Sequence, residues 1–109
     1  MLNLSHNEFR TLDAKIIKEA LTHNETIYEL DLSWNHLRLE GATAVVDGIA
    51  RNTSIEVLNL AFNGFSDEGA TAMGKALKSN QSLTMLDLTY NRISNKGAKV
   101  TIEFIDVYI

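Results

Sequence analysis

The sequence repeats itself with a period of 28 residues. Leucines at positions 2, 30, 58 and 86 open four similar stretches, LNLSHNEF, LDLSWNHL, LNLAFNGF and LDLTYNRI. Self-similarity at a fixed period of this length indicates an array of units that each bury their core against a neighbour. We divide the chain into units at approximately 2–29, 30–57, 58–85 and 86–109, the last one divergent, and we interpret residues 1–109 as a single domain.

Each unit changes its hydrophobic period partway along. Leu30-Asp31-Leu32 alternates apolar and polar residues, as a short strand with one buried face does, whereas Gly41 to Arg51 carries apolar residues at helical spacing. Each unit is therefore predicted to contain one strand and one helix. Strands joined through helices run parallel, so the units predict an α/β fold with a parallel sheet. Ser66 and Ser94 stand where a hydroxyl could cap a helix start.

Two columns of small or polar residues recur at the same period. An alanine is expected to let each helix approach its neighbours closely, and these alanines are Ala14, Ala42, Ala70 and Ala98. An asparagine follows each strand, where its amide can both donate to and accept from the backbone groups that leave the sheet. These residues, Asn7, Asn35, Asn63 and Asn91, are predicted to form a ladder across the units.

Composition excludes several classes of protein. The hydrophobic fraction of 45% is that of a folded domain, and a net charge of -4 without a basic cluster argues against nucleic acid or a membrane surface as partner. Cysteine is absent, so disulfides and thiolate metal sites are excluded. Asn24, Asn52 and Asn80 match the N-glycosylation pattern, but we interpret them as repeat positions because they also recur every 28 residues. With no signal-peptide pattern at the N-terminus, we expect a cytoplasmic location.

No pattern in the sequence predicts catalysis or a cofactor. His6, His23 and His36 occupy three different places in the unit, so a shared metal site is not expected. Phosphate-binding and nucleophile motifs are absent, and the glycines at 41, 69 and 97 mark the helix starts. We expect neither enzymatic activity, nor a cofactor, nor a metal.

The pattern LxxLxLxxNxL from Ile27 to Leu37, followed by Gly41-Ala42, resembles the ribonuclease-inhibitor type of leucine-rich repeat protein. The resemblance extends over nearly the whole chain. It implies a leucine-rich repeat solenoid, a horseshoe arc with parallel strands on the concave face and helices on the convex face. It also implies that partners are bound by the concave face.

The residues that differ between units are the candidate binding residues. Strand alternation buries the leucines and turns the residues between and after them outward. One variable position holds a ring in every unit, and an acidic edge is expected beside this column. The candidates are His6, Glu29, Asp31, Trp34, Asn59, Phe62, Asp87 and Tyr90. Two interpretations stay open: a surface that recognises a protein segment with an apolar strip and positive charge, or rings that only cover the sheet by packing on one another.

The two ends depart from the repeat. Met1 is followed at once by a predicted strand with no capping unit, and Val100 to Ile109 is rich in β-branched residues. Those last residues are compatible with a distorted helix, with Thr101, Phe104 and Ile105 at core positions, or with a strand. We expect a fragment or short form of a longer repeat protein. The alternative is self-association in which uncapped ends cover each other.

These features predict a protein-protein interaction module or scaffold that binds a partner protein through the concave sheet face. The first alternative is a regulator of a small GTPase resembling the Ran GTPase-activating proteins. The second is a structural remnant that folds but has no partner of its own.

Overall fold

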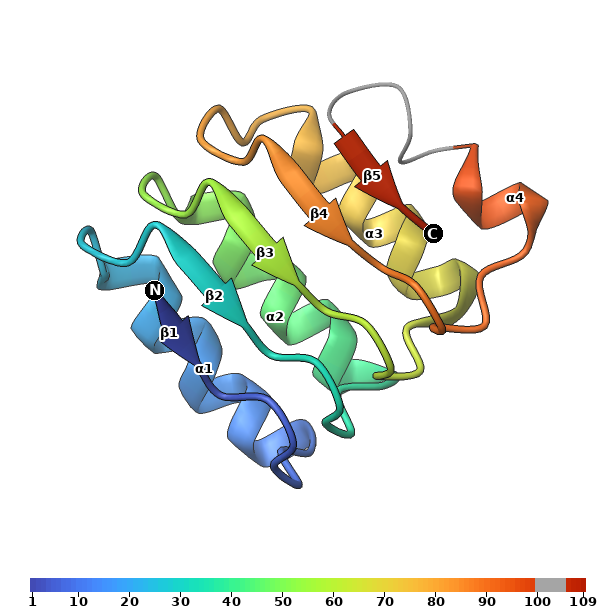
Figure 1. Ribbon diagram of the computed structural model, residues 1–109, viewed down its shortest axis with the longest axis horizontal. Coiled ribbons are helices and arrows are strands. Elements are labelled where there is room, and N and C mark those ends of the chain that lie inside the picture. Colours follow the sequence, from blue (N-terminus) through green and yellow to red (C-terminus); the bar gives the residue numbers. More distant parts are fainter. Residues whose placement is uncertain (100–105) are drawn as a thin grey trace.

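The computed structural model describes residues 1–99 and 106–109 and shows a parallel sheet with helices packed on one face (Figure 1). The strands are β1 (Leu2–Asn3), β2 (Glu29–Asp31), β3 (Val57–Asn59), β4 (Met85–Asp87) and β5 (Asp106–Tyr108). The helices are α1 (Thr11–His23), α2 (Glu40–Arg51), α3 (Ser66–Leu77) and α4 (Asn95–Ala98). Strand and helix alternate along the chain, as the change of period within each unit predicts.

The strands lie in sequence order, each parallel to the next. Leu2 pairs with Leu30, Leu30 with Leu58, and Leu58 with Leu86, so each pairing joins residues 28 positions apart. The repeat is therefore the register of the sheet. This arrangement confirms the predicted α/β leucine-rich repeat solenoid, with the sheet on one side and the helices on the other (Figure 1).

The core fills the space between the sheet and the helices. The strand leucines at 30, 58 and 86, and those two residues after them at 32, 60 and 88, are at most 2% exposed. Ala14, Ala42 and Ala70 are almost completely buried, as expected for residues that allow close helix packing. A larger side chain at Ala42 would overpack this layer and cost about 1–3 kcal/mol.

Three of the four asparagines predicted to form a ladder bond across units, whereas the Nδ2 of Asn7 donates only to Leu4 and Ser5 of its own unit within the described residues. Asn63 Nδ2 donates to the carbonyl oxygens of Leu32, Leu60 and Ala61, at 2.9, 3.1 and 3.2 Å, and its Oδ1 accepts from the amide of Leu37. Asn35 and Asn91 make equivalent bonds in their own units, and all three side chains are buried. Each amide thus ties the backbone of its own unit to that of the unit before.

A second asparagine ladder lies between units where each helix ends and the loop to the next strand begins. Asn52 Nδ2 donates to the carbonyl oxygens of Leu21 and Asn24, and its Oδ1 accepts from the amides of Ser54 and Ile55. Asn80 repeats the arrangement one unit later. Asn52 is only 3% exposed, so the recurrence of these residues has a structural cause.

The last unit is shorter than the others. Ser94 caps α4, with its Oγ accepting from the amide of Lys96. By contrast, Ser66 lies inside α3, after the N-cap residue Phe65, so its predicted capping role is wrong. In β5, Val107 pairs with Leu86, 21 residues earlier, and the strand interpretation is confirmed for Asp106–Tyr108. Thr101, Phe104 and Ile105, the core positions of the helix interpretation, lie outside the described residues.

Candidate functional site

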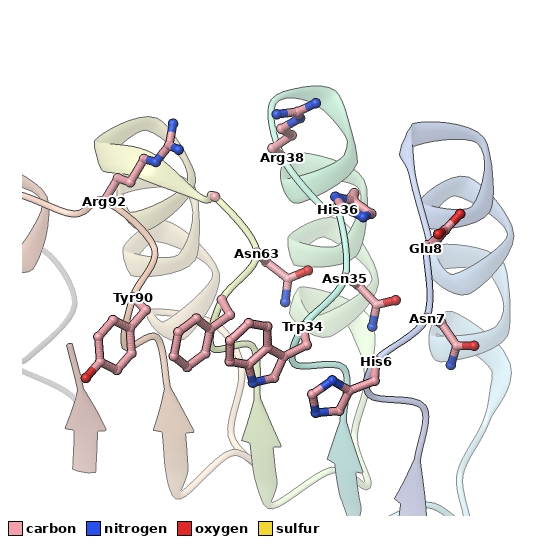
Figure 2. Close-up of a pocket in the computed structure, with 12 residues that line it drawn as sticks. His6, Asn7, Glu8, Trp34, Asn35, His36, Arg38, Asn63, Tyr90 and Arg92 are labelled. Carbon is pink, nitrogen blue, oxygen red and sulfur yellow. The ribbon is translucent and has the colours of Figure 1, made fainter.

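The four ring-bearing residues form one continuous stack, which we call the ring stack: His6, Trp34, Phe62 and Tyr90. Neighbouring ring centroids are 5.4, 3.8 and 4.2 Å apart in that order, and the planes of neighbours differ by only 12–13°. Figure 2 shows the rings in a row just beyond the ends of the strands. The rings therefore contact each other through their faces, and their edges form a shared surface.

The backbone at all four ring positions is left-handed. The φ angles are 56° at His6, 55° at Trp34, 57° at Phe62 and 56° at Tyr90. This conformation costs an L-residue roughly 1–2 kcal/mol, and glycine or asparagine adopts it more easily than a bulky ring does. The chain thus keeps rings where glycine or asparagine would be less strained, which is typical of functional positions.

Hydrogen bonds between units hold this bend in place. The amide of Trp34 donates to the carbonyl oxygen of Ala61 at 3.0 Å, and the amide of Phe62 donates to that of Thr89 at 3.0 Å. These bonds continue the parallel pairing beyond the strands. The ring stack is therefore fixed by the same register as the sheet.

The predicted candidates Asp31, Asn59 and Asp87 also shape the bend. The Oδ1 atom of each accepts from the amide two residues further on, at 2.9 Å for Asp31 and Asp87 and 3.0 Å for Asn59. Such side chains stabilise tight turns by replacing a backbone acceptor. These residues hold the turn that leads to the ring, and they remain half-buried at the surface of the sheet.

The structure divides the predicted candidates between two neighbouring regions. Glu29, Asp31, Asn59 and Asp87 line a shallow hollow over the strands, together with Tyr108 of β5. The rings instead lie in the loops that follow the strands, because the left-handed residues turn the chain out of the sheet. Ser33 and Ala61, which strand alternation predicts to face outward, are each only 5% exposed. We call the first group the sheet-face residues.

Three basic residues near the ring stack were not predicted as site residues. His36, Arg38 and Arg92 lie further along the same loops (Figure 2), and with the rings they line a hollow of about 530 Å³. All three side chains are exposed, and none forms an ion pair within the described part of the chain. In the sequence, the sign of their role is that each follows a ring-bearing residue by two or four positions. It becomes informative only once the rings are placed in the loops.

Two features are absent from residues 1–99 and 106–109. This part of the chain contains no group of three or more histidine, aspartate or glutamate side chains that could hold a metal ion. None of its helices is long and apolar enough to cross a bilayer. The arrangement offers apolar ring edges, carboxylates and guanidinium groups for contact with another molecule.

A stacked parallel sheet, two asparagine ladders and a 28-residue register define a leucine-rich repeat solenoid. The family model described as "Leucine Rich repeat" matches residues 23–46, 51–74 and 79–100, more than half of the chain. The chain belongs to the leucine-rich repeat family.

Comparison of structures supports the same fold. A solved structure titled "Leiomodin-1 Actin-Binding Site 2 (ABS2)" is similar with a TM-score of 0.85 and 23% sequence identity. The match covers 98% of this chain and 68% of that one. Among curated protein sequences, none matches the chain.

Proposed function

We propose that the protein is an interaction module or scaffold that binds a partner protein through the sheet side of the solenoid. The contact surface consists of the ring stack and the sheet-face residues. The observation that carries this proposal is the exposure of the stacked rings. Trp34 is 48% exposed and Tyr90 is 74% exposed, although each has a ring packed against it.

Packing alone accounts for part of this arrangement. Stacked pairs contribute roughly 0.5–1.5 kcal/mol each beyond the area that they bury, and a left-handed backbone costs about 1–2 kcal/mol. The faces of the rings take part in this packing, whereas Trp34 and Tyr90 keep much of their surface accessible. Rigid aromatic side chains with accessible edges are favoured anchors in protein interfaces, because they bury a large area for little loss of rotamer freedom.

Candidate partners come from the comparisons and from the sequence resemblance. The leiomodin-1 chain is described by its title as an actin-binding site, which makes actin one partner to test. The GTPase-regulating alternative is a second candidate, but no feature of the described residues favours it over other protein partners. A cytoplasmic location is part of the proposal.

A capture experiment with a matched variant tests the proposal. The wild type and the double variant Trp34→Ala, Tyr90→Ala are immobilised and exposed to cell extract or to purified actin, and bound proteins are identified. Far-UV circular dichroism and thermal unfolding establish that both proteins are folded. We expect a specific partner to bind the wild type and not the folded variant.

Two results would contradict this function. In the first, the folded double variant captures the same proteins as the wild type, which would place the contact elsewhere. In the second, the variant fails to fold, which would assign the rings to packing. The milder variant Tyr90→Ala then separates folding from binding, because Tyr90 is more exposed than Trp34 and has one stacked neighbour in the described residues.

A further inference from the structure

The surroundings of the ring stack specify the charge of what it binds. Resting on the proposed function, we propose that the hollow beside the ring stack receives an acidic protein segment that alternates carboxylates with apolar side chains. The sequence alone predicts the opposite charge for the partner, because it places an acidic edge beside the rings. The structure places His36, Arg38 and Arg92 in the hollow with the rings, and the predicted carboxylates in a neighbouring hollow over the strands.

The position of the two arginines supports an acidic ligand. Arg38 and Arg92 line the same hollow as Trp34, Phe62 and Tyr90. Figure 2 shows the rings as a row next to the strands and Arg38, His36 and Arg92 further along the loops. The rings run across the repeats and the cations lie in the second and fourth units, so one extended segment lying across the loops could contact both.

Arg38 and Arg92 have no ion-pair partner within the described part of the chain. The two ion pairs in the described part of the chain are Lys18 with Asp47 and His23 with Glu19. Both pairs involve α1, and neither involves the loops that carry Arg38 and Arg92. A protein of net charge -4 thus presents two guanidinium groups, with no ion-pair partner among the described residues, beside an exposed aromatic surface. Guanidinium groups pair with carboxylates through two parallel hydrogen bonds, which selects for acidic ligands.

The lining of this hollow carries little negative charge. Glu8 also lines the hollow, in the first unit, beside His6. The opposing charge is therefore confined to one end, and the units that carry Trp34, Phe62 and Tyr90 present only basic or neutral side chains to the hollow. The sheet-face carboxylates Asp31 and Asp87 line a different hollow. An acidic segment would accordingly lie over the second, third and fourth units.

The sequence contains a single tryptophan, Trp34, so its fluorescence reports on this site without labelling. The probe is a synthetic peptide of alternating glutamate and leucine, and the comparison peptide carries lysine in place of glutamate. We expect the glutamate peptide to change the emission of Trp34 in a saturable manner and the lysine peptide to bind more weakly. Raising the salt concentration should weaken the glutamate peptide's binding, since the pairs are exposed to solvent.

A pair of variants with equal net charge isolates the role of the two arginines. Arg38→Glu with Arg92→Glu changes the net charge from -4 to -8. Lys15→Glu with Lys75→Glu makes the same change on exposed helix positions. We expect the arginine variant to lose affinity on the order of tenfold, because two attractive pairs become repulsive. The lysine variant should bind as the wild type does.

Three outcomes would overturn the inference: equal or tighter binding of the lysine peptide, unchanged affinity in the arginine variant, or no effect of either peptide on Trp34. Each would leave the proposed function standing if the capture experiment still found a partner that depends on the rings. If the capture experiment finds no ring-dependent partner but the glutamate peptide still binds, the hollow is a peptide site and the proposed function is wrong.

Discussion

At the scale of single residues, the unusual feature is a bulky ring in a left-handed backbone conformation in every unit. The ring at residue 34 gains from stacking on Phe62, 3.8 Å away between centroids, while its backbone is strained at φ 55°. Glycine relieves that strain and loses the stacking, whereas alanine loses the stacking and keeps the strain. Because both variants lose the stacking, the difference in their stability reports the backbone strain alone.

We therefore predict that Trp34→Gly is more stable than Trp34→Ala by about 1 kcal/mol. The order is the reverse of that found in regular helices and strands, where glycine is the less stable residue. Urea unfolding followed by circular dichroism measures the difference. Lower stability of the glycine variant would show that the left-handed backbone is absent in solution.

The asparagine ladder gives a second prediction at this scale. Asn63→Ala should lower the free energy of unfolding by about 3 kcal/mol, because several backbone groups lose their partners in a buried place. Asn7→Ala removes the equivalent residue of the first unit, which is exposed, and should cost less than about 1 kcal/mol. Comparable losses from the two substitutions, measured by urea unfolding, would contradict the assignment of the ladder to unit stacking.

At the scale of elements, α3 and α4 are joined by one acidic side chain. Asp67 accepts from Ser94 Oγ at 2.6 Å and from the Ser94 amide at 2.7 Å. These bonds, with a smaller contribution from the charge of Lys96, hold the pKa of Asp67 below its ordinary value. Hydrogen bonds to the ionised form favour that form.

The sign of the pH dependence follows from this lowered pKa. The unfolded chain titrates at Asp67 near the ordinary value of about 3.9, so the stabilisation is complete above that pH. It is lost as the pH falls through the lower, folded-state pKa. We predict that Ser94→Ala raises the pKa of Asp67 toward its ordinary value, measured by NMR titration of the carboxyl carbon. An unchanged pKa in that variant would show that the contact does not form.

The sequence predicts elements well where one periodicity governs them. Repetition at 28 residues predicts the strands, the helices, the register and the asparagine ladder, because each depends on equivalent residues meeting across units. Period-two alternation, extended past Leu32, predicts that the rings lie on the strand face, but the left-handed Trp34 ends this alternation. Alternation carries no information about the sign of φ, and so the basic residues of the loops could not be placed beside the rings.

At the scale of the whole molecule, the two ends of the solenoid differ. At the first end, Leu12 and Ile16 on α1 are 75% and 70% exposed. At the other end, β5 pairs with the edge of β4, and the amide of Leu88 donates to the carbonyl oxygen of Tyr108. The sequence allows this strand as one of two interpretations, but it does not predict its position, because the 21-residue offset between Leu86 and Val107 breaks the repeat.

We predict that Val107→Asp releases β5 from the sheet. Val107 is half-buried against the core, and an unpaired carboxylate there is costly. Amide hydrogen exchange at Leu88 should then accelerate, while exchange at Leu60, which donates to Asp87, should change little. Tyr108→Ala serves as the control because that side chain is exposed. Equal protection of Leu88 in the Val107 variant would mean that β5 does not cover this edge.

The proposed binding surface exists only if distant units share one face, and NMR cross-relaxation between ring protons measures this most directly. In the folded protein, we predict cross-peaks between the rings of Trp34 and Phe62 and between those of Phe62 and Tyr90, pairs whose centroids lie 3.8 and 4.2 Å apart. Assigned spectra of the folded protein that lack both sets of cross-peaks would contradict the account.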